Sequence, residues 1–280
     1  MDRRARPRPQ LRPRLKESPF RRIPRPLLWS LAVCAAVAGC AFSVALARTA
    51  EEALAEGDQS YAAARLEDAR RAYAEAVQAS SGNVNALCRL SRTESELGEL
   101  QKGDEQRRTW ADAVSHARDA VRVAGESAEP HVWLAVALGR QALREGPRAK
   151  LALSKEIKSE TDLALARDPA NGRAWHVLAM WNSKLASLSA FDRMVANSVL
   201  GGVPKGASYA NAAQAFEKAI ALEPQYVNHH VEYGRLLKEM GRKADARREL
   251  EKAIALPPTS SALDARYQDA ARALLEKLGR

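Results

Sequence analysis

The sequence predicts an all-α fold: an α-solenoid of antiparallel helical hairpins with one interrupted repeat, preceded by a single hydrophobic membrane segment. Three observations lead to this prediction. A sequence block recurs near the C-terminus with a displacement of 34 residues, a spacing typical of helical repeats. A run of 21 residues without any charge lies near the N-terminus. No useful length of sequence alternates between apolar and polar residues, so no strand is predicted.

The recurring block has the spacing of a tetratricopeptide repeat. EKAIALEP at residues 217–224 returns as EKAIALPP at residues 251–258, and Phe216 corresponds to Leu250. The pattern Ala-x3-Phe/Leu-x2-Ala-x4-Pro at a 34-residue period is the signature of this repeat class. Small alanines let the two helices of a hairpin approach, the large side chain fills the space between them, and the proline ends the second helix.

Weaker copies of the pattern extend the array upstream. The alanine and aromatic or aliphatic spacing recurs from Ala69 and from Ala117, and Ala164 precedes Pro169 at the expected distance. The sequence therefore predicts about five helical hairpins between residues 50 and 258. A capping helix is predicted at residues 263–278, and the whole tetratricopeptide-repeat domain is assigned to residues 48–280.

The array is interrupted near residues 186–207. Pro169 and Pro224 are 55 residues apart, which is one 34-residue period and 21 further residues. Glycines and a proline at 201–206 stand where the second helix of the hairpin would otherwise begin. The simplest prediction is a short helix at about 189–200, a Gly/Pro turn, and the true second helix from Tyr209.

The positive charge of the chain lies mostly in a tail. The formal net charge is +10, but residues 1–26 contain ten Lys/Arg and two acidic residues, a balance of 10 − 2 = +8, which leaves about +2 for the rest. Six of the thirteen prolines also lie in this tail, which we therefore predict to be disordered. The excess positive charge therefore indicates how the chain is oriented in a membrane. Because the repeat domain is nearly neutral, no nucleic-acid partner is predicted.

Residues 27–47 form the uncharged segment, and as a helix they would be about 30 Å long, roughly the hydrocarbon thickness of a bilayer. Ten basic residues precede the segment, so the positive-inside rule places the tail in the cytoplasm and the repeat domain across the membrane. We expect the domain to be extracytoplasmic and periplasmic. The favoured fate is a retained transmembrane anchor. The alternatives are signal-peptide cleavage near Ala47 and lipidation of Cys40, which follows Val37-Ala38-Gly39 as in a lipobox.

Four stretches resemble one particular family. They are PHVWLAVALG (130–139), LALSKEIKSETDLALARDP (151–169), AWHVLAMW (174–181) and FDRMVANSVLGGVPKGASYANAAQAFEKAIALEP (191–224). The chain resembles the regulator-of-microtubule-dynamics family of tetratricopeptide-like proteins, as a bacterial-type member. The resemblance implies a non-enzymatic binding protein with this fold. It also implies a phospholipid as an alternative ligand, since eukaryotic members are tied to microtubules and organelle membranes and some are credited with phospholipid binding.

The sequence contains no recognisable catalytic or cofactor motif. GxGxxG, GxxxxGK[ST], GxSxG and HExxH are all absent, and no histidine has a cysteine at metal-ligand spacing. The adjacent His229 and His230 are interpreted as a satisfied or solvated pair, and the three cysteines have no zinc or redox spacing. We therefore expect no enzyme activity, no cofactor and no metal site.

The predicted binding site is the concave groove, which the first helix of each hairpin lines in a helical solenoid. The expected groove residues of the fourth and fifth hairpins form a basic stripe with a small apolar component: Arg173, His176, Met180, Lys184, Asn228, Val231, Arg235 and Lys238. This stripe suits an acidic peptide or an anionic head group.

Two hypotheses of function follow. The first is a tetratricopeptide-repeat adaptor or scaffold that binds a partner protein at the bacterial cell envelope. The alternative, drawn from the family resemblance, is a lipid-binding or membrane-contact module.

Overall fold

The computed structural model describes residues 48–199, 202, 204–258 and 261–279. The predicted tail at 1–26, the segment at 27–47 and the lipidation candidate Cys40 lie outside these residues. Within them, no helix is both long enough and apolar enough to cross a bilayer. Residues 48–280 form a compact unit, and every apolar cluster described below lies inside it.

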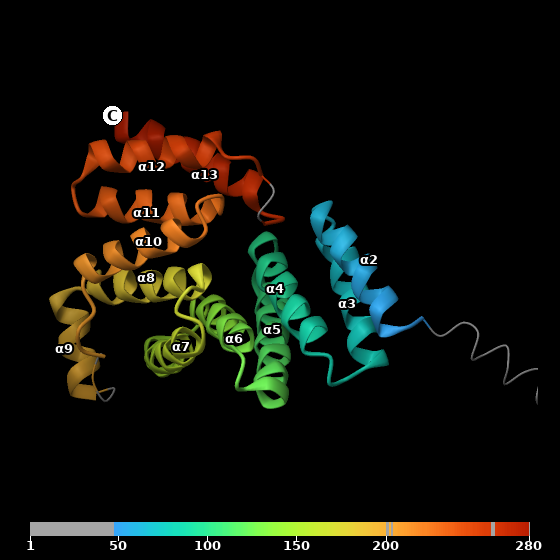
Figure 1. Cartoon of the computed structure of the whole chain (residues 1–280). Coiled ribbons are helices and arrows are strands. Elements are labelled where there is room, and N and C mark those ends of the chain that lie inside the picture. The colour runs from blue at the N-terminus through green and yellow to red at the C-terminus, as the bar shows by residue number, and fades with distance from the viewer. Residues whose placement is uncertain (1–47, 200–201, 203, 259–260, 280) are drawn as a thin grey trace, which may run out of the picture. The chain divides into compact units, whose positions relative to one another are not determined.

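The described part of the chain is entirely helical and forms stacked hairpins, which confirms the predicted all-α solenoid (Figure 1). The helices pair as follows: α2 (Ala50–Ala62) with α3 (Leu66–Ala79), α4 (Val84–Leu100) with α5 (Gly103–Ala124), α6 (Ala128–Ala142) with α7 (Pro147–Arg167), α8 (Gly172–Ala186) with α10 (Tyr209–Leu222), and α11 (Val227–Glu239) with α12 (Lys243–Ala255). The last helix, α13 (Asp264–Gly279), packs on α11 and α12.

Several helices begin at a side chain that caps free backbone N–H groups. The capping residues are Thr49, Asn83, Asn171 and Ser208, whose side-chain oxygens accept from the backbone three residues on. Thr49 forms a reciprocal capping box with Glu52. These four capping residues set the starts of α2, α4, α8 and α10.

Glycines bring the two helices of a hairpin into close contact. A Cβ atom at Gly57 would lie 2.3 Å from the ring of Tyr73, and one at Gly98 would lie 2.3 Å from the indole nitrogen of Trp110. Tyr73 and Trp110 are both buried. The absent side chain therefore makes room for a large aromatic residue of the second helix.

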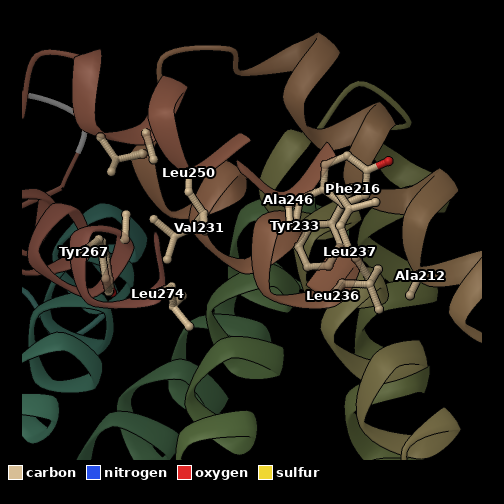
Figure 2. Close-up of a cluster of buried hydrophobic side chains, with 14 of the residues drawn as sticks. Ala212, Phe216, Val231, Tyr233, Leu236, Leu237, Ala246, Leu250, Tyr267 and Leu274 are labelled. Carbon is tan, nitrogen blue, oxygen red and sulfur yellow. The ribbon is translucent and has the colours of Figure 1, made fainter. Parts of the chain in front are cut away.

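The largest apolar cluster joins α8, α10, α11, α12 and α13 and also includes Leu66 of α3 and Leu97 of α4 (Figure 2). Phe216 is fully buried in it, stacked on Tyr233 with ring centroids 5.7 Å apart. Leu250, the repeat equivalent of Phe216, is also fully buried. The residues that define the 34-residue repeat are thus the ones that fill the hairpin cores.

The interruption contains a separate short helix, α9 (Ala190–Val199). It lies between α8 and α10 in the chain, while α8 and α10 pair directly as a hairpin. Gly202 and Gly206 have φ of 88° and 86°, values that favour glycine, and they form the turn that leads to α10. The extra residues thus form an appendage at the edge of the fourth hairpin.

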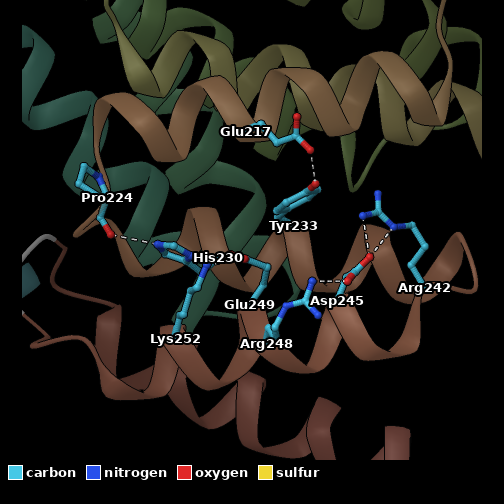
Figure 3. A network of polar contacts seen from close by, with 9 residues as sticks. All are labelled: Glu217, Pro224, His230, Tyr233, Arg242, Asp245, Arg248, Glu249 and Lys252. Carbon is cyan, nitrogen blue, oxygen red and sulfur yellow. Dashed lines mark hydrogen bonds and ion pairs between the residues drawn. The ribbon is translucent and has the colours of Figure 1, made fainter.

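A histidine ties the fifth hairpin together (Figure 3). His230 Nδ1 lies 2.8 Å from the Glu249 carboxylate of α12, and Nε2 lies 3.0 Å from the carbonyl of Pro224. Burial by itself would raise the pKa of Glu249, but the bonds from His230 and Lys252 outweigh it and hold that pKa below its ordinary value. His131 repeats the arrangement, with Nδ1 at 2.5 Å from Glu160 and Nε2 at 2.7 Å from the carbonyl of Gly125.

The segment before α13 contacts the first two hairpins. Ser261 Oγ donates to Glu96 of α4 at 3.1 Å, and the backbone N–H of Ala262 donates to the hydroxyl of Tyr61 of α2 at 3.3 Å. Tyr267 donates to Glu99 at 3.1 Å. Residues 165 to 201 positions apart are therefore in direct contact, and the C-terminal cap covers part of the inner face of α2 and α4.

Candidate functional site

A group of charged and aromatic side chains gathers where the first helices of the hairpins face one another. We call it the central polar cluster. It draws on α2, α4, α6, α8, α11 and α13 and comprises Tyr61, Arg92, Glu96, Glu99, Trp133, Arg140, Arg173, His176, Tyr226, His229 and Tyr267.

Two guanidinium groups of this cluster lie against aromatic rings. Cζ of Arg92 is 3.7 Å from the ring centroid of Tyr61 and 5.7 Å from that of Trp133. Cζ of Arg173 is 5.4 Å from Trp133 and 4.7 Å from Tyr226. At these distances the ring faces attract the cations and hold both arginines beside the same indole.

These arginines are incompletely paired. Arg92 makes no ion pair among the described residues, and its buried Nε has no hydrogen-bond partner there. Within the described part of the chain, Arg173 forms an ion pair only with Glu223, at 3.5 Å, and one quarter of its side chain stays exposed. Because a buried guanidinium N–H without a partner is costly, the cluster favours an added acceptor such as a carboxylate or phosphate oxygen.

The carboxylates of α4 are already engaged within the chain. Glu96 accepts hydrogen bonds from Tyr61, at 2.7 and 2.8 Å, and from Ser261. Its burial raises the pKa of the carboxyl, although the bonds from Tyr61 and the nearby Arg92 act against this. Glu99 pairs with Arg140 and accepts from Tyr267.

A pair of histidines lies beside the arginines. The Nδ1 atoms of His176 and His229 are 2.9 Å apart, so one ring donates and the other accepts. Burial, followed by the positive charges of Arg140 and Arg173, lowers the pKa of His176 to about 3. Burial also lowers the pKa of His229 well below its ordinary value, with His176 and Arg173 adding to the effect. Both rings are therefore neutral at physiological pH.

This pair predicts an acid-side loss of stability. The pKa of His176 is lowered on folding, so the unfolded chain binds the proton more tightly, and the stabilisation present above about pH 6.5 is lost as the pH falls toward 3. We expect acidification from about pH 7 to about pH 4.5 to reduce the free energy of unfolding of the native protein by roughly 2 kcal/mol more than that of His176→Gln. Urea unfolding at a series of pH values measures the difference.

His116 provides the matched control. Burial lowers its pKa, but the bond to Glu94 outweighs this and holds the pKa above its ordinary value. His116→Gln is therefore expected to keep the acid-side loss that His176→Gln removes. Equal pH profiles for native protein and His176→Gln would show that the His176 ring does not stay neutral in the fold.

The predicted groove residues of α8 separate into two groups. Arg173 and His176 belong to the central polar cluster. Met180 packs against the apolar cluster of the C-terminal hairpins, and Lys184 is exposed at the end of the helix, close to the start of α9. The expected stripe along α8 is thus polar and inward-facing only over its first turns.

On α11 the prediction needs a correction. Asn228 and Val231 are buried, Val231 completely, so they do not line an open groove. Figure 2 shows Val231 among Leu250, Tyr267 and Leu274, because the capping helix α13 packs against this face of α11. Arg235 and Lys238 remain accessible and line a hollow of about 330 Å³ between α11 and α13, together with Glu239, Leu274 and Lys277.

The sequence interpretation missed most members of the cluster, yet a signal for several was present. Arg92, Glu96 and Glu99 are spaced i, i+4 and i+7, so they lie on one face of their helix. Trp133 and Arg140 are seven residues apart and share one face of the next first helix in the same way. The first helices of the second and third hairpins line the inner side of the solenoid just as those of the fourth and fifth do. Tyr61 and Tyr267 had no such signal.

The stacked hairpins, and a polar cluster on the inner side of their first helices, define a tetratricopeptide-repeat protein. Residues 49–279 match the family described as "Regulator of microtubule dynamics protein 1-3", and the chain belongs to that family.

Individual relatives are distant. The chain is 28% identical to regulator of microtubule dynamics protein 3 of Rattus norvegicus, over 61% of this chain and 36% of the relative. It is 25% identical to protein 1 of Mus musculus, over 65% of this chain and 59% of the relative. The matched region thus spans between about a third and three fifths of these relatives.

A similar solved structure is that of a thermophilic TPR protein in Thermus thermophilus, with a TM-score of 0.59 at 19% identity. The match covers 79% of this chain and 98% of that protein. At this identity the likeness establishes the fold alone.

Proposed function

We propose that this chain is a non-enzymatic tetratricopeptide-repeat adaptor that binds a segment of a partner protein at the central polar cluster. The observation that carries the proposal is the placement of Arg92 and Arg173 beside the ring of Trp133. Nε of Arg92 has no hydrogen-bond partner among the residues that the structure describes, and part of Arg173 is exposed. We retain the hypothesis of an acidic ligand. The proposed binding position is no longer the face of α11 but Arg92 of α4 and Arg173 of α8, beside Trp133 of α6.

The chemistry of the cluster defines the partner. Two guanidinium groups held by aromatic rings suit a carboxylate, which an arginine can bind through two parallel hydrogen bonds. The ring of Trp133 is buried, so it holds the two guanidinium groups in place and does not itself form an open contact surface. The partner segment therefore presents an acidic residue or a chain-terminal carboxylate.

The proposed location is the bacterial cell envelope, as a bacterial-type member of the family, with residues 27–47 as a retained anchor and the repeat domain periplasmic. Support comes from the uncharged segment and the ten basic residues that precede it. Intact-mass measurement of the mature protein distinguishes a full chain from one cleaved near Ala47 or lipidated at Cys40, and either of the latter two masses would overturn the anchor. A microtubule role, which the names of the relatives describe, is not proposed for a domain in that compartment.

The adaptor proposal predicts a charge-dependent partner. Arg92→Gln with Arg173→Gln removes both positive charges while keeping side chains of similar length, so we expect at least about a tenfold loss of the captured partner. The measurement is quantitative capture from detergent-solubilised membranes followed by mass spectrometry. Arg118→Gln with Arg122→Gln, two exposed arginines of α5, is the matched control. Unchanged capture by the Arg92/Arg173 variant would remove the cluster as the partner site.

The alternative is a lipid-binding module, and the same arginines are the observation that favours it, because a phosphate head group is an equally suitable acceptor for guanidinium N–H groups. Native mass spectrometry of residues 48–280 tests this alternative. A co-purified lipid that is lost in the Arg92/Arg173 variant would replace the protein partner by a phospholipid. A spectrum without bound lipid would leave the protein-binding adaptor as the only one of the two proposals that still stands.

A further inference from the structure

Glu96 lies close to Arg92 but forms no ion pair with it in the part of the chain that the structure describes. The two residues are four positions apart on α4, a spacing at which opposite charges meet on a helix. Lys158 and Asp162 have the same order and spacing on α7, and there the ammonium lies 2.6 Å from the carboxylate. Other bonds must therefore hold the Glu96 carboxylate away from the guanidinium.

Two hydroxyl groups provide these bonds. The Tyr61 hydroxyl lies 2.8 Å from Oε1 and 2.7 Å from Oε2 of Glu96, so it engages both oxygens. Ser261 Oγ donates to Oε1 at 3.1 Å. Burial, followed by the charge of Glu96, raises the pKa of Tyr61 well above its ordinary value, so its hydroxyl keeps the proton that it donates. Neutral hydroxyls thus satisfy the carboxylate without using a guanidinium group.

Backbone groups of the C-terminal segment orient both hydroxyls. The N–H of Ala262 donates to the Tyr61 hydroxyl at 3.3 Å, and the N–H of Leu263 donates to Ser261 Oγ at 3.1 Å. Each hydroxyl oxygen accepts a bond from the backbone, which leaves its own proton directed at Glu96. The arrangement therefore exists only when the segment before α13 lies against α2 and α4.

Tyr61 also holds the arginine that Glu96 would otherwise bind. Cζ of Arg92 is 3.7 Å from the centroid of the Tyr61 ring. The ring face attracts the guanidinium group, while the hydroxyl at the ring edge binds the carboxylate. One side chain thus keeps the two charges apart, and the buried Nε of Arg92 has no hydrogen-bond partner among the described residues.

We propose that Tyr61 and Ser261 are positioning residues of the partner site: they hold the Glu96 carboxylate away from Arg92 and so leave this guanidinium available for a carboxylate of the partner. The inference rests on the proposed function and adds to it, because it assigns roles to residues of the first helix and of the C-terminal segment. Both residues act through Glu96, so the site is complete only when the two ends of the repeat domain meet.

Peptide binding to residues 48–280 tests the proposal. This part of the chain contains the apolar clusters of the fold, and it lacks the basic tail, which would itself bind an acidic probe. The probe is a fluorescein-labelled peptide of four glutamates with a free C-terminus, and its binding is measured by fluorescence anisotropy. Tyr61→Phe keeps the ring beside Arg92 and removes only the hydroxyl. We expect the released Glu96 carboxylate to pair with Arg92 and to weaken peptide binding at least about fivefold.

A second substitution distinguishes positioning from a structural role. Glu96→Gln, introduced into the Tyr61→Phe protein, removes the negative charge that would occupy Arg92, so we expect binding to return to within about twofold of the native value. A structural defect caused by the missing hydroxyl would not be repaired in this way. Tyr73→Phe is the matched control, because Tyr73 donates to Asp58 at 2.8 Å in the same hairpin but outside the cluster, and we expect it to leave peptide binding unchanged.

The positioning role and the proposed function fail in different ways. Native-like binding by Tyr61→Phe, or a loss that Glu96→Gln does not restore, would overturn the positioning role and leave the adaptor standing. No peptide binding by the native domain, or unchanged binding by Arg92→Gln with Arg173→Gln, would overturn the acidic-ligand site and the inference with it. Thermal unfolding shows which variants are folded in the assay, and Ser261→Ala with the same Glu96→Gln rescue carries the test if Tyr61→Phe is unfolded.

Discussion

Replacing Phe216 with alanine is expected to lower the free energy of unfolding by about 3–5 kcal/mol. The ring is completely buried between two hairpins, stacked on Tyr233 and in edge contact with His176 at 5.4 Å between centroids. Its removal leaves a cavity that the rigid helices around it only partly close. Urea unfolding of the two proteins at neutral pH measures the loss.

Leu222→Ala is the matched control for this substitution. It removes a large side chain from the same helix, but Leu222 is 42% exposed, so the expected cost is below about 1 kcal/mol. Equal costs at the two positions would show that Phe216 does not occupy the core of the fourth hairpin. The result bears on the candidate site as well, because the Phe216 ring supports His176 of the central polar cluster.

The second large loss of stability is expected when Gly98 of α4 is replaced by alanine, which adds a single methyl group. Gly98→Ala places a Cβ atom 2.3 Å from Nε1 and 2.5 Å from Cδ1 of Trp110. The indole is buried and donates to the carbonyl of Ser95 at 3.1 Å, so it moves only by breaking that bond or by separating α4 from α5. We expect a loss of about 3 kcal/mol, measured by denaturant unfolding.

Gly139→Ala tests whether the clash is the cause. Gly139 also lies within a helix, but no atom comes within 4 Å of a Cβ atom built there. Alanine is the better helix former, so this substitution is expected to stabilise the protein by about 0.5–1 kcal/mol. A stable Gly98→Ala protein would contradict the close contact between α4 and Trp110, whereas opposite signs for the two glycines would support it.

The helical hairpins and the interruption were predictable because both are local. The spacing from Ala212 to Pro224 encodes the second helix of a hairpin, its contact with the first helix and its end, and the same spacing recurs at 246–258. The sequence also predicted a short helix at about 189–200 followed by a helix from Tyr209, where the structure has α9 and α10. Small residues, large residues and prolines at set distances act through neighbours in the chain.

The candidate site could not be predicted in the same way, because it is formed by contacts between residues that lie far apart in the sequence. The sequence placed the binding surface on one face of α8 and α11, but Asn228 and Val231 are buried, and Val231 lies in the apolar cluster that includes α13. A capping helix was predicted, yet which side chains of α11 it would bury follows from the packing angle between the two helices.

The sequence by itself determined the repeat class, the number of hairpins, the position of the interruption and the uneven distribution of charge. Only the tertiary structure decided which charged residues meet. Tyr61, Glu96 and Ser261 are in contact because the small rotations between five successive hairpins add up to bring the segment before the last helix against α2 and α4. Each rotation depends on many side-chain contacts at once, so their sum is set by three-dimensional packing and is not visible in the order of residues.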